Sequence, residues 1–517
     1  MTTEAEATPI HSKREVTQAM SGLMLGMFVA ILAGTVVSNA LPRIVAELKG
    51  SQSIFAWIVT TELLAMTATV PLWGKLADLY SRKLLIQASL SLYVAGSLIA
   101  GFSQNIEMLI VSRVVQGLGA GGVTALATIV MAAMIPPREL GRYSGLFGAV
   151  FGVGTVAGPL IGGVLVDTSW LGWRWCFFVG VPFALAAIWL LQRTLHLPVV
   201  RKEETKIDYL GAFLIVSGVS TLLIWSSLAG QKFEWASGWT AGLVSLGVLL
   251  LVAAVRVEAT AHDPIVPLSI FRNRTVALTV IASALVGVAM FGGTVFLSQY
   301  FQLSLGKTPT QAGLLGLPLI LGLLISSTVA GQLITKYGKW KAYLVSGGVV
   351  MVGGMLLLST ITAHTTIFMV SVDMFVLGVG VGLLMQNLVL AAQNDVPARD
   401  LGATTSTLTF FRSLGGAIGV SALGAVLASK VSSLAAEKFG AMGGSGSGEA
   451  QVPDLSVLPP EIKAVIADIY ATATAEIFLV GTPFAVLALL AVLFIKEKPL
   501  KEQSGDDRLA AEMASGH

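Results

Sequence analysis

The sequence has 517 residues, of which 55% are hydrophobic and 12% charged, and its mean hydropathy is +0.81. This balance excludes an ordinary soluble globular protein, in which about a quarter of the residues are charged. The net charge of +3 gives no reason to expect a nucleic-acid partner, and the single cysteine, Cys176, excludes an internal disulfide. The composition therefore predicts a protein embedded in a lipid bilayer.

Fourteen apolar runs follow one another along the chain, each close to the roughly 20 residues that a helix needs to cross a bilayer core. They predict an all-α membrane protein with fourteen transmembrane helices. The runs lie near residues 19–41, 54–75, 84–103, 106–131, 142–166, 174–194, 209–229, 238–256, 275–303, 311–334, 342–361, 366–391, 401–428 and 473–495.

The basic residues divide unevenly between the two sides of this arrangement. With the N-terminus inside, 22 of the 32 lysines and arginines lie on inner segments and 8 on outer segments. Cytoplasmic segments carry such an excess, so the pattern predicts that both termini lie in the cytoplasm. We expect a multi-pass protein that acts as a monomer in the lipid bilayer.

The segment between the second and third runs, GKLADLYSRK (74–83), places an acid beside two bases at a tight turn. Asp78, Arg82 and Lys83 can form charge-assisted hydrogen bonds with nearby helix ends, and Gly74 permits a close approach. We expect this segment to latch the two halves of the protein together. Anchoring of its basic residues at the inner surface is the simpler alternative.

Within the fourth run, LIVSRVVQGLGAGG (109–122) carries Arg113 about eight residues from the outer end. A charge at that depth is costly and needs a partner, so Arg113 is a candidate functional residue, with a structural ion pair as the alternative. The glycines from Gly117 to Gly122 also fit the G-x-G-x-x-G pattern. Dinucleotide binding needs a strand before that pattern, so helix packing explains these glycines better.

The fifth run includes GLFGAVFGVGTVAGPLIGG (145–163), whose small residues would weaken a helix in water. In lipid the backbone satisfies its own hydrogen bonds, so the run stays helical and offers a groove for close helix packing. We also expect a bend near the proline. The residues concerned are Gly145, Gly154, Gly158, Pro159, Gly162 and Gly163.

Several of these features recur 261 residues further along the chain, where Pro397 repeats Pro136 and Gly378 repeats Gly117. The repeat predicts two parallel six-helix bundles with two inserted helices between them, an architecture in which transporters rock around a central site. A short amphipathic helix is expected near the end of a long outer loop. The predicted segments are a cytoplasmic tail at 1–18, a first bundle at 19–196, inserted helices at 197–258, a second bundle at 259–495 with the outer loop at 429–472, and a cytoplasmic tail at 496–517.

Together these motifs resemble those of the drug:proton antiporters of the major facilitator superfamily, in the fourteen-helix EmrB/QacA-type branch. The resemblance covers nearly the whole chain and includes the 74–83 segment, the Arg113, Gln116 and Gly117 positions, and the glycines and proline of the fifth run. It implies a protein of the bacterial cytoplasmic membrane that exports small hydrophobic or cationic drugs. Export would proceed by alternating access and would be driven by proton influx.

The sequence departs from that branch at the usual proton site, where an acidic residue is replaced by Ala33. Either the proton route has moved or the coupling differs. Glu62 in the second run is the nearest substitute, because helical rise places it at a depth similar to that of Arg113. Asp373 in the twelfth run is the second candidate, and a contact with lipid headgroups is its alternative role.

Aromatic and methionine side chains suit a broad apolar cavity for varied substrates, although such residues also pack helices or face lipid. The candidates are Met290, Phe291, Phe296, Tyr300 and Met385. We expect no enzyme, cofactor or metal, because the sequence has no nucleotide loop, metal-ligand set or nucleophile constellation. The alternatives to multidrug export are a dedicated exporter of one natural product or lipid, and a non-transporting receptor or scaffold.

Overall fold

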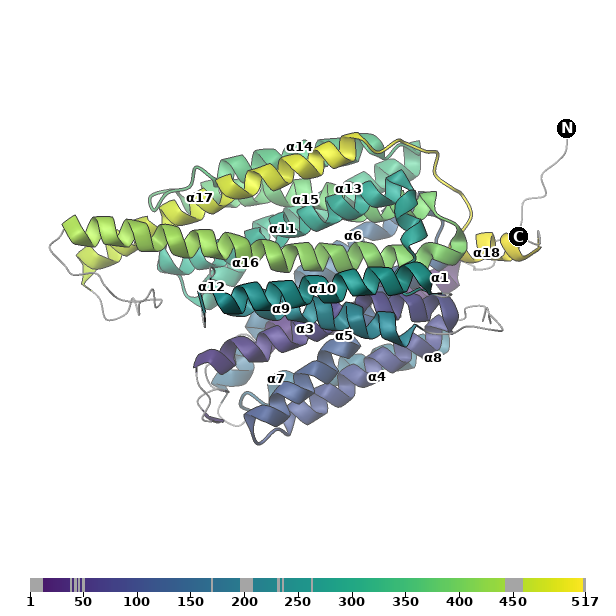
Figure 1. The fold of residues 1–517 in the computed structure, drawn as a ribbon, viewed down its shortest axis with the longest axis horizontal. Coiled ribbons are helices and arrows are strands. Elements are labelled where there is room, and N and C mark those ends of the chain that lie inside the picture. Colours follow the sequence, from purple (N-terminus) through teal and green to yellow (C-terminus); the bar gives the residue numbers. More distant parts are fainter. Residues whose placement is uncertain are drawn as a thin grey trace.

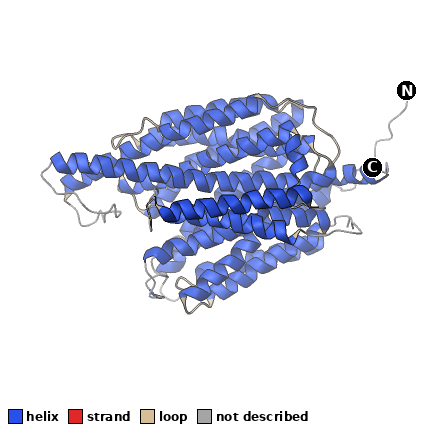
Figure 2. Ribbon diagram, viewed as in Figure 1, coloured by secondary structure: helices blue, strands red, loops and turns tan. Residues whose placement is uncertain are grey.

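The computed structural model describes residues 13–37, 40, 44, 47–48, 52–168, 171–195, 208–229, 233–234, 237–261, 264–441 and 459–514. Within these ranges the chain is almost entirely helical (Figure 2). An isolated β-bridge pairs Ala229 with Phe233. Thirteen of the described helices are long and apolar enough to cross a membrane. Helix α3, with 28 residues, covers the second predicted apolar run. The all-α fold predicted from the apolar runs is therefore confirmed.

The helices follow the predicted order along the chain. The first bundle contains α1 (Lys13–Val36), α3 (Gln52–Leu79), α4 (Arg82–Gly101), α5 (Ile106–Met134), α6 (Pro137–Asp167), α7 (Trp175–Phe178) and α8 (Gly180–Thr194). The inserted helices are α9 (Tyr209–Leu228) and α10 (Gly238–Thr260). The remaining elements are η2 (Leu268–Arg272), α11 (Arg274–Leu303), α12 (Pro309–Leu315), α13 (Leu317–Tyr337), α14 (Lys341–Leu358), α15 (Ile367–Asp395), η3 (Ala398–Asp400), α16 (Leu401–Ala441), α17 (Pro460–Leu493) and α18 (Gly505–Ala514).

Short polar side chains set several helix starts. Asn105, Ser237 and Thr366 accept a hydrogen bond from a backbone amide in the first turn of α5, α10 and α15, respectively. These amides have no partner within their own helix, so the caps satisfy donors that would otherwise be lost in lipid.

The repeat seen in the sequence is also present in the helix packing. Gly117 on α5 lies against the backbone carbonyl of Glu62 on α3, and Gly378 on α15 lies in the same way against that of Leu319 on α13. A Cβ at either glycine would collide with the carbonyl oxygen. Equivalent glycines therefore bring equivalent helices of the two bundles into backbone contact.

The inserted helices lie across the boundary between the two bundles. Figure 1 shows α9 and α10 in front, between α16 of the second bundle and α3 of the first. Helix α9 packs against both α3 and α16. At one end of the bundles, α18 lies beside Arg82, at the start of α4. We call this end of the molecule the α18 face.

Both ends of the segment predicted as an outer loop, 429–472, are helical in the structure. Helix α16 continues to Ala441, and α17 begins at Pro460 and includes the predicted amphipathic helix. The two extensions share a small apolar cluster that contains Val431 and Ile469. Each extension thus buries an apolar stripe against the other, and this packing keeps them helical where the apolar runs become mixed with polar residues.

Candidate functional site

Arg113 lies in the interior of the first bundle and forms an ion pair with Glu62. Both side chains are almost completely buried, with exposed fractions of 0% and 3%. The guanidinium also donates to the backbone carbonyl of Ile58 at 3.1 Å and to the side-chain oxygen of Gln116 at 2.7 Å. Such partners are required in this setting, because breaking a buried ion pair costs about 3–5 kcal/mol.

Neighbouring helices hold this ion pair in place. Gln116 donates to the hydroxyl of Ser97 on α4 at 2.8 Å. The Arg113 guanidinium lies 5.8 Å from the centroid of the Phe177 ring on α7. Because Gly117 brings α5 against the Glu62 backbone, three of the predicted site residues, Glu62, Arg113 and Gln116, meet in one network.

Asp373, the second candidate acid, lies on α15 in the other bundle and is 7% exposed. It precedes Leu377 by four residues and Gly380 by seven, and both of these residues contact α14. Helical periodicity therefore places Asp373 on the α14 side of its helix. Ala33, at the usual acidic position, is buried among apolar side chains of the main core.

The 74–83 segment joins the two bundles at the α18 face. Asp78, near the end of α3, accepts a hydrogen bond from the backbone amide of Ala403 on α16 at 3.0 Å. Gly74, one turn earlier, lies against Ser406 of the same helix, and a Cβ at Gly74 would collide with the serine side chain. The acid and the glycine of this segment thus make the contact between bundles that the latch hypothesis requires.

The two basic residues of the segment have separate partners. The Arg82 guanidinium lies 2.9 Å from a carboxylate oxygen of Asp506 on α18. Lys83 donates to the backbone carbonyl of Gln192, at the end of α8, at 2.7 Å. Consecutive residues of a helix point about 100° apart, so Lys83 is directed within its own bundle, whereas Arg82 is directed toward α18.

The segment predicted as a C-terminal tail, 496–517, contains α18, which connects both bundles. Gly505 packs against Ala132 and Ala133 of α5 in the first bundle. Arg508 donates to the backbone carbonyl of Val396, after α15 in the second. Sequence reasoning missed this helix, although Ser504 is a usable N-cap and two aspartates follow in the first turn.

The glycines of the fifth run pack α6 against α1, inside the first bundle. Gly154 lies against Ile31, and Gly158 lies against Thr35. The Thr35 hydroxyl also donates to the Gly154 carbonyl at 3.1 Å. Gly162 lies against the backbone carbonyl of Val36. Helix α6 is continuous through this stretch, and the surroundings of three further predicted residues lie outside the described part of the structure: Gly145, Pro159 and Gly163.

The five residues suggested for a substrate cavity occupy different packing environments. Phe296 belongs to the cluster between α11, α16 and α17, and Phe291 lies against α16. Tyr300 is fully buried and donates to a backbone carbonyl after α14 at 2.8 Å. Met290 and Met385 pack in the main core. None of the five lines the cavity described next.

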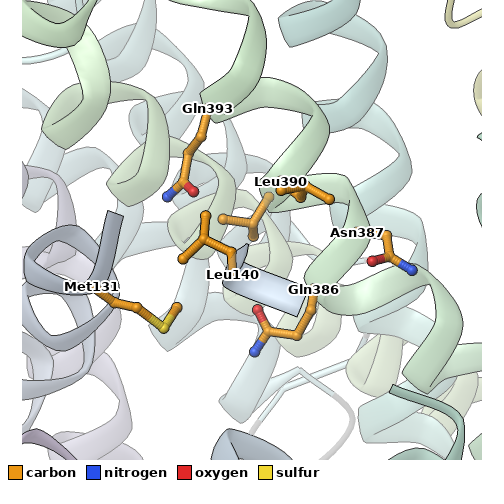
Figure 3. Close-up of a pocket in the computed structure, with 7 residues that line it drawn as sticks. Met131, Leu140, Gln386, Asn387, Leu390 and Gln393 are labelled. Atoms are coloured by element: carbon orange, nitrogen blue, oxygen red, sulfur yellow. The ribbon is translucent and has the colours of Figure 1, made fainter. Parts of the chain in front are cut away.

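A small cavity lies between the bundles, toward the α18 face. Figure 3 shows the carboxamides of Gln386 and Gln393 on α15 on either side of Leu140 from α6. Gln393 donates to Thr405 on α16 at 2.9 Å, and its side-chain oxygen has no hydrogen-bond partner among the described residues. The lining residues, which carry no charge, are Met131, Leu140, Gln386, Asn387, Val389, Leu390 and Gln393.

The sequence profile of the Major Facilitator Superfamily matches residues 23–420, which is most of the chain. The chain belongs to this superfamily. It is 36% identical to the uncharacterised MFS-type transporter Rv1877 of Mycobacterium tuberculosis, over 94% of this chain and 70% of that protein. It is 33% identical to the multidrug transporter protein MdtP of Bacillus subtilis, over 89% of this chain and 81% of that protein.

A solved structure shows the same fold for this superfamily member. The crystal structure of the human organic anion transporter MFSD10 matches with a TM-score of 0.58 and 14% sequence identity, over 91% of this chain and 99% of that one. The relatives of this transporter include multidrug transporters, consistent with the drug:proton antiporter branch.

Proposed function

We propose that this transporter exports hydrophobic, often cationic compounds across a bacterial cytoplasmic membrane in exchange for protons. The multidrug relative MdtP supports the substrate class. The excess of basic residues on the inner segments supports an orientation with the α18 face in the cytoplasm. The buried ion pair of Glu62 and Arg113 carries the proposal, because it is an ionisable pair in the interior of a membrane-spanning bundle.

Protonation of Glu62 would remove one charge of the pair and leave Arg113 bound to neutral oxygens. The guanidinium would keep its hydrogen bonds to the backbone carbonyl of Ile58 and to the side-chain amide oxygen of Gln116, because both acceptors are neutral. Its attraction to α3 would fall, since Glu62 is the charged partner that α3 contributes. A single proton would thus weaken the link between α3 and α5, and α3 is the helix that contacts the second bundle through Gly74 and Asp78.

Contacts at the α18 face define the state that this proton would change. The hydrogen bond from Ala403 to Asp78 and the ion pair of Arg82 and Asp506 close that face in the structure. Opening requires α3 to move away from α16. In the proposed cycle, proton binding at Glu62 alters the position of α3 and so allows the bundles to rock.

Drug-driven proton movement in proteoliposomes tests the proposal, with Glu62→Gln, Asp373→Asn and the double variant. We expect Glu62→Gln to abolish proton movement and Asp373→Asn to retain most of it. Glu139→Gln is a matched control, because that carboxylate is exposed at the start of α6. Proton movement at the wild-type level in Glu62→Gln would overturn the assignment, and its loss in Asp373→Asn alone would place the proton site at Asp373 instead. A panel of chemically unlike compounds would show a narrow profile if the transporter serves one natural product.

A further inference from the structure

Two carboxylates outside the site described above meet where the inserted helices approach α3. Glu258 lies in the last turn of α10 and is 4% exposed. One of its oxygens accepts a hydrogen bond from the backbone amide of Val266 at 2.9 Å. Asp208 is the N-cap of α9, and one of its oxygens accepts from the backbone amide of Gly211 at 2.8 Å. Each carboxylate therefore has one oxygen committed to the backbone.

The second oxygens of the two carboxylates point to a common spot. Both atoms, Oε1 of Glu258 and Oδ2 of Asp208, are buried and have no hydrogen-bond partner in the described structure. A Cβ at Gly211 would collide with both of them. The two oxygens thus converge over the α-carbon of Gly211, in space that any larger residue would fill.

Two ionised carboxylates that converge in this way repel each other, because like charges in a desolvated site raise the free energy steeply. A single proton resolves the conflict, since a protonated carboxyl donates a hydrogen bond and the ionised partner accepts it. We propose that Asp208 and Glu258 bind and share one proton, which makes the inserted helices a second proton-binding site of this transporter.

A proton fits this site better than a metal ion. A divalent cation such as Ca²⁺ takes six or more oxygen ligands, whereas two free carboxylate oxygens converge here. No group of three or more potential ligand side chains that could hold a metal occurs among the described residues.

The charged groups around the pair connect it to the latch. Lys75 on α3 is 8% exposed and interacts electrostatically with Glu258 and also with Asp78, the acid that bonds to α16. The backbone amides of Ile265 and Val266 approach Glu258 from the segment after α10. Loss of the shared proton would add a negative charge on the α10 side of Lys75. The ammonium would then be drawn toward the inserted helices and away from Asp78.

Infrared difference titration of the purified transporter in nanodiscs tests the shared proton, because a protonated carboxyl has a carbonyl band separate from those of a carboxylate. The variants are Glu258→Gln and Asp208→Asn. Glutamine keeps an oxygen for the Val266 amide, and asparagine is a good N-cap, so both variants should fold. Glu139→Gln, an exposed acid at the same face, is the control.

We expect the wild type to show a titrating protonated-carboxyl band that is lost in Glu258→Gln and in Asp208→Asn and is retained in Glu139→Gln. Either substitution alone should remove the band, because the new side-chain amide donates the hydrogen bond that the shared proton made, and the remaining carboxylate stays ionised. An identical band in the wild type and both variants would overturn the proposal. So would a band that Na⁺ removes at constant pH, which would identify a cation site instead. The measurement involves no transport, so its outcome is independent of the proposed export function.

Discussion

The Arg82 guanidinium lies 2.9 Å from the Asp506 carboxylate, and this ion pair connects residues that are 424 positions apart in the sequence. Asp506 is 2% exposed and Arg82 is 13% exposed, so water screens the pair only weakly. Arg82 starts α4 in the first bundle, whereas α18 is also bonded to the end of α15 in the second. Helix α18 is therefore part of the contact between the bundles at the α18 face.

Loss of this ion pair should loosen α18. In Arg82→Gln or Asp506→Asn, the charge-assisted hydrogen bond, worth about 1.5–3 kcal/mol, is lost. We expect the amides of α18 to exchange hydrogen about ten- to hundredfold faster, as measured by mass spectrometry. Lys83→Gln is the matched control, because Lys83 bonds within the first bundle and its loss should leave α18 unchanged. Equal exchange in all variants would refute the contact.

A methyl group at Gly74 should separate α3 from α16. In Gly74→Ala the new Cβ meets the side chain of Ser406, so the bundles cannot close fully at the α18 face. Spin labels at the exposed positions Tyr80 and Arg399 would report a longer distance, in a background without the native Cys176.

The same experiment contains its own rescue and control. Ser406→Gly removes both serine atoms nearest to the new methyl group, so Gly74→Ala with Ser406→Gly should return to the short distance. Gly353→Ala places a methyl group where no atom lies within 4 Å and should change nothing. A Gly74→Ala distance equal to that of the wild type would contradict the close contact.

Helices α16 and α17 should show charge pairing. Lys430 lies 2.6 Å from Glu476, and both side chains are about one-third exposed. Exchange of the charges in Lys430→Glu with Glu476→Lys should recover most of the stability that either single change removes. We expect a coupling energy of about 0.2–1 kcal/mol in a double-mutant cycle of denaturant unfolding. Additive effects of the two substitutions would show that the pair contributes nothing.

The sequence predicted the membrane fold and the main elements of the candidate site, because both depend on local patterns. Apolar runs fix the number of spanning helices, and a fixed rise per residue places Glu62 and Arg113 at a similar depth. That the two side chains meet depends on the rotation of α3 against α5. The contact of Gly117 with the Glu62 backbone sets that rotation, and a single glycine in a glycine-rich chain does not reveal its neighbour.

The partners of Arg82 and Lys83 could not be predicted, because they depend on long-range packing. Asp506 lies in a short polar helix without an apolar run, so hydropathy does not reveal that helix. The sequence next to Arg82 and Lys83 also does not show which way either side chain points. The full lengths of α16 and α17 could not be predicted for a related reason. Their extensions are stabilised by each other, and hydropathy along one segment cannot show a partner on another.

The central claim is that Glu62 couples proton binding to the movement of α3, and one comparison in proteoliposomes tests it most directly. Drug accumulation driven by a pH gradient and drug exchange without a gradient are measured in the same Glu62→Gln preparation. The account predicts that gradient-driven accumulation is lost while exchange persists, because substitution removes the proton site and leaves the latch and the helix packing. Gradient-driven accumulation at the wild-type level would contradict it.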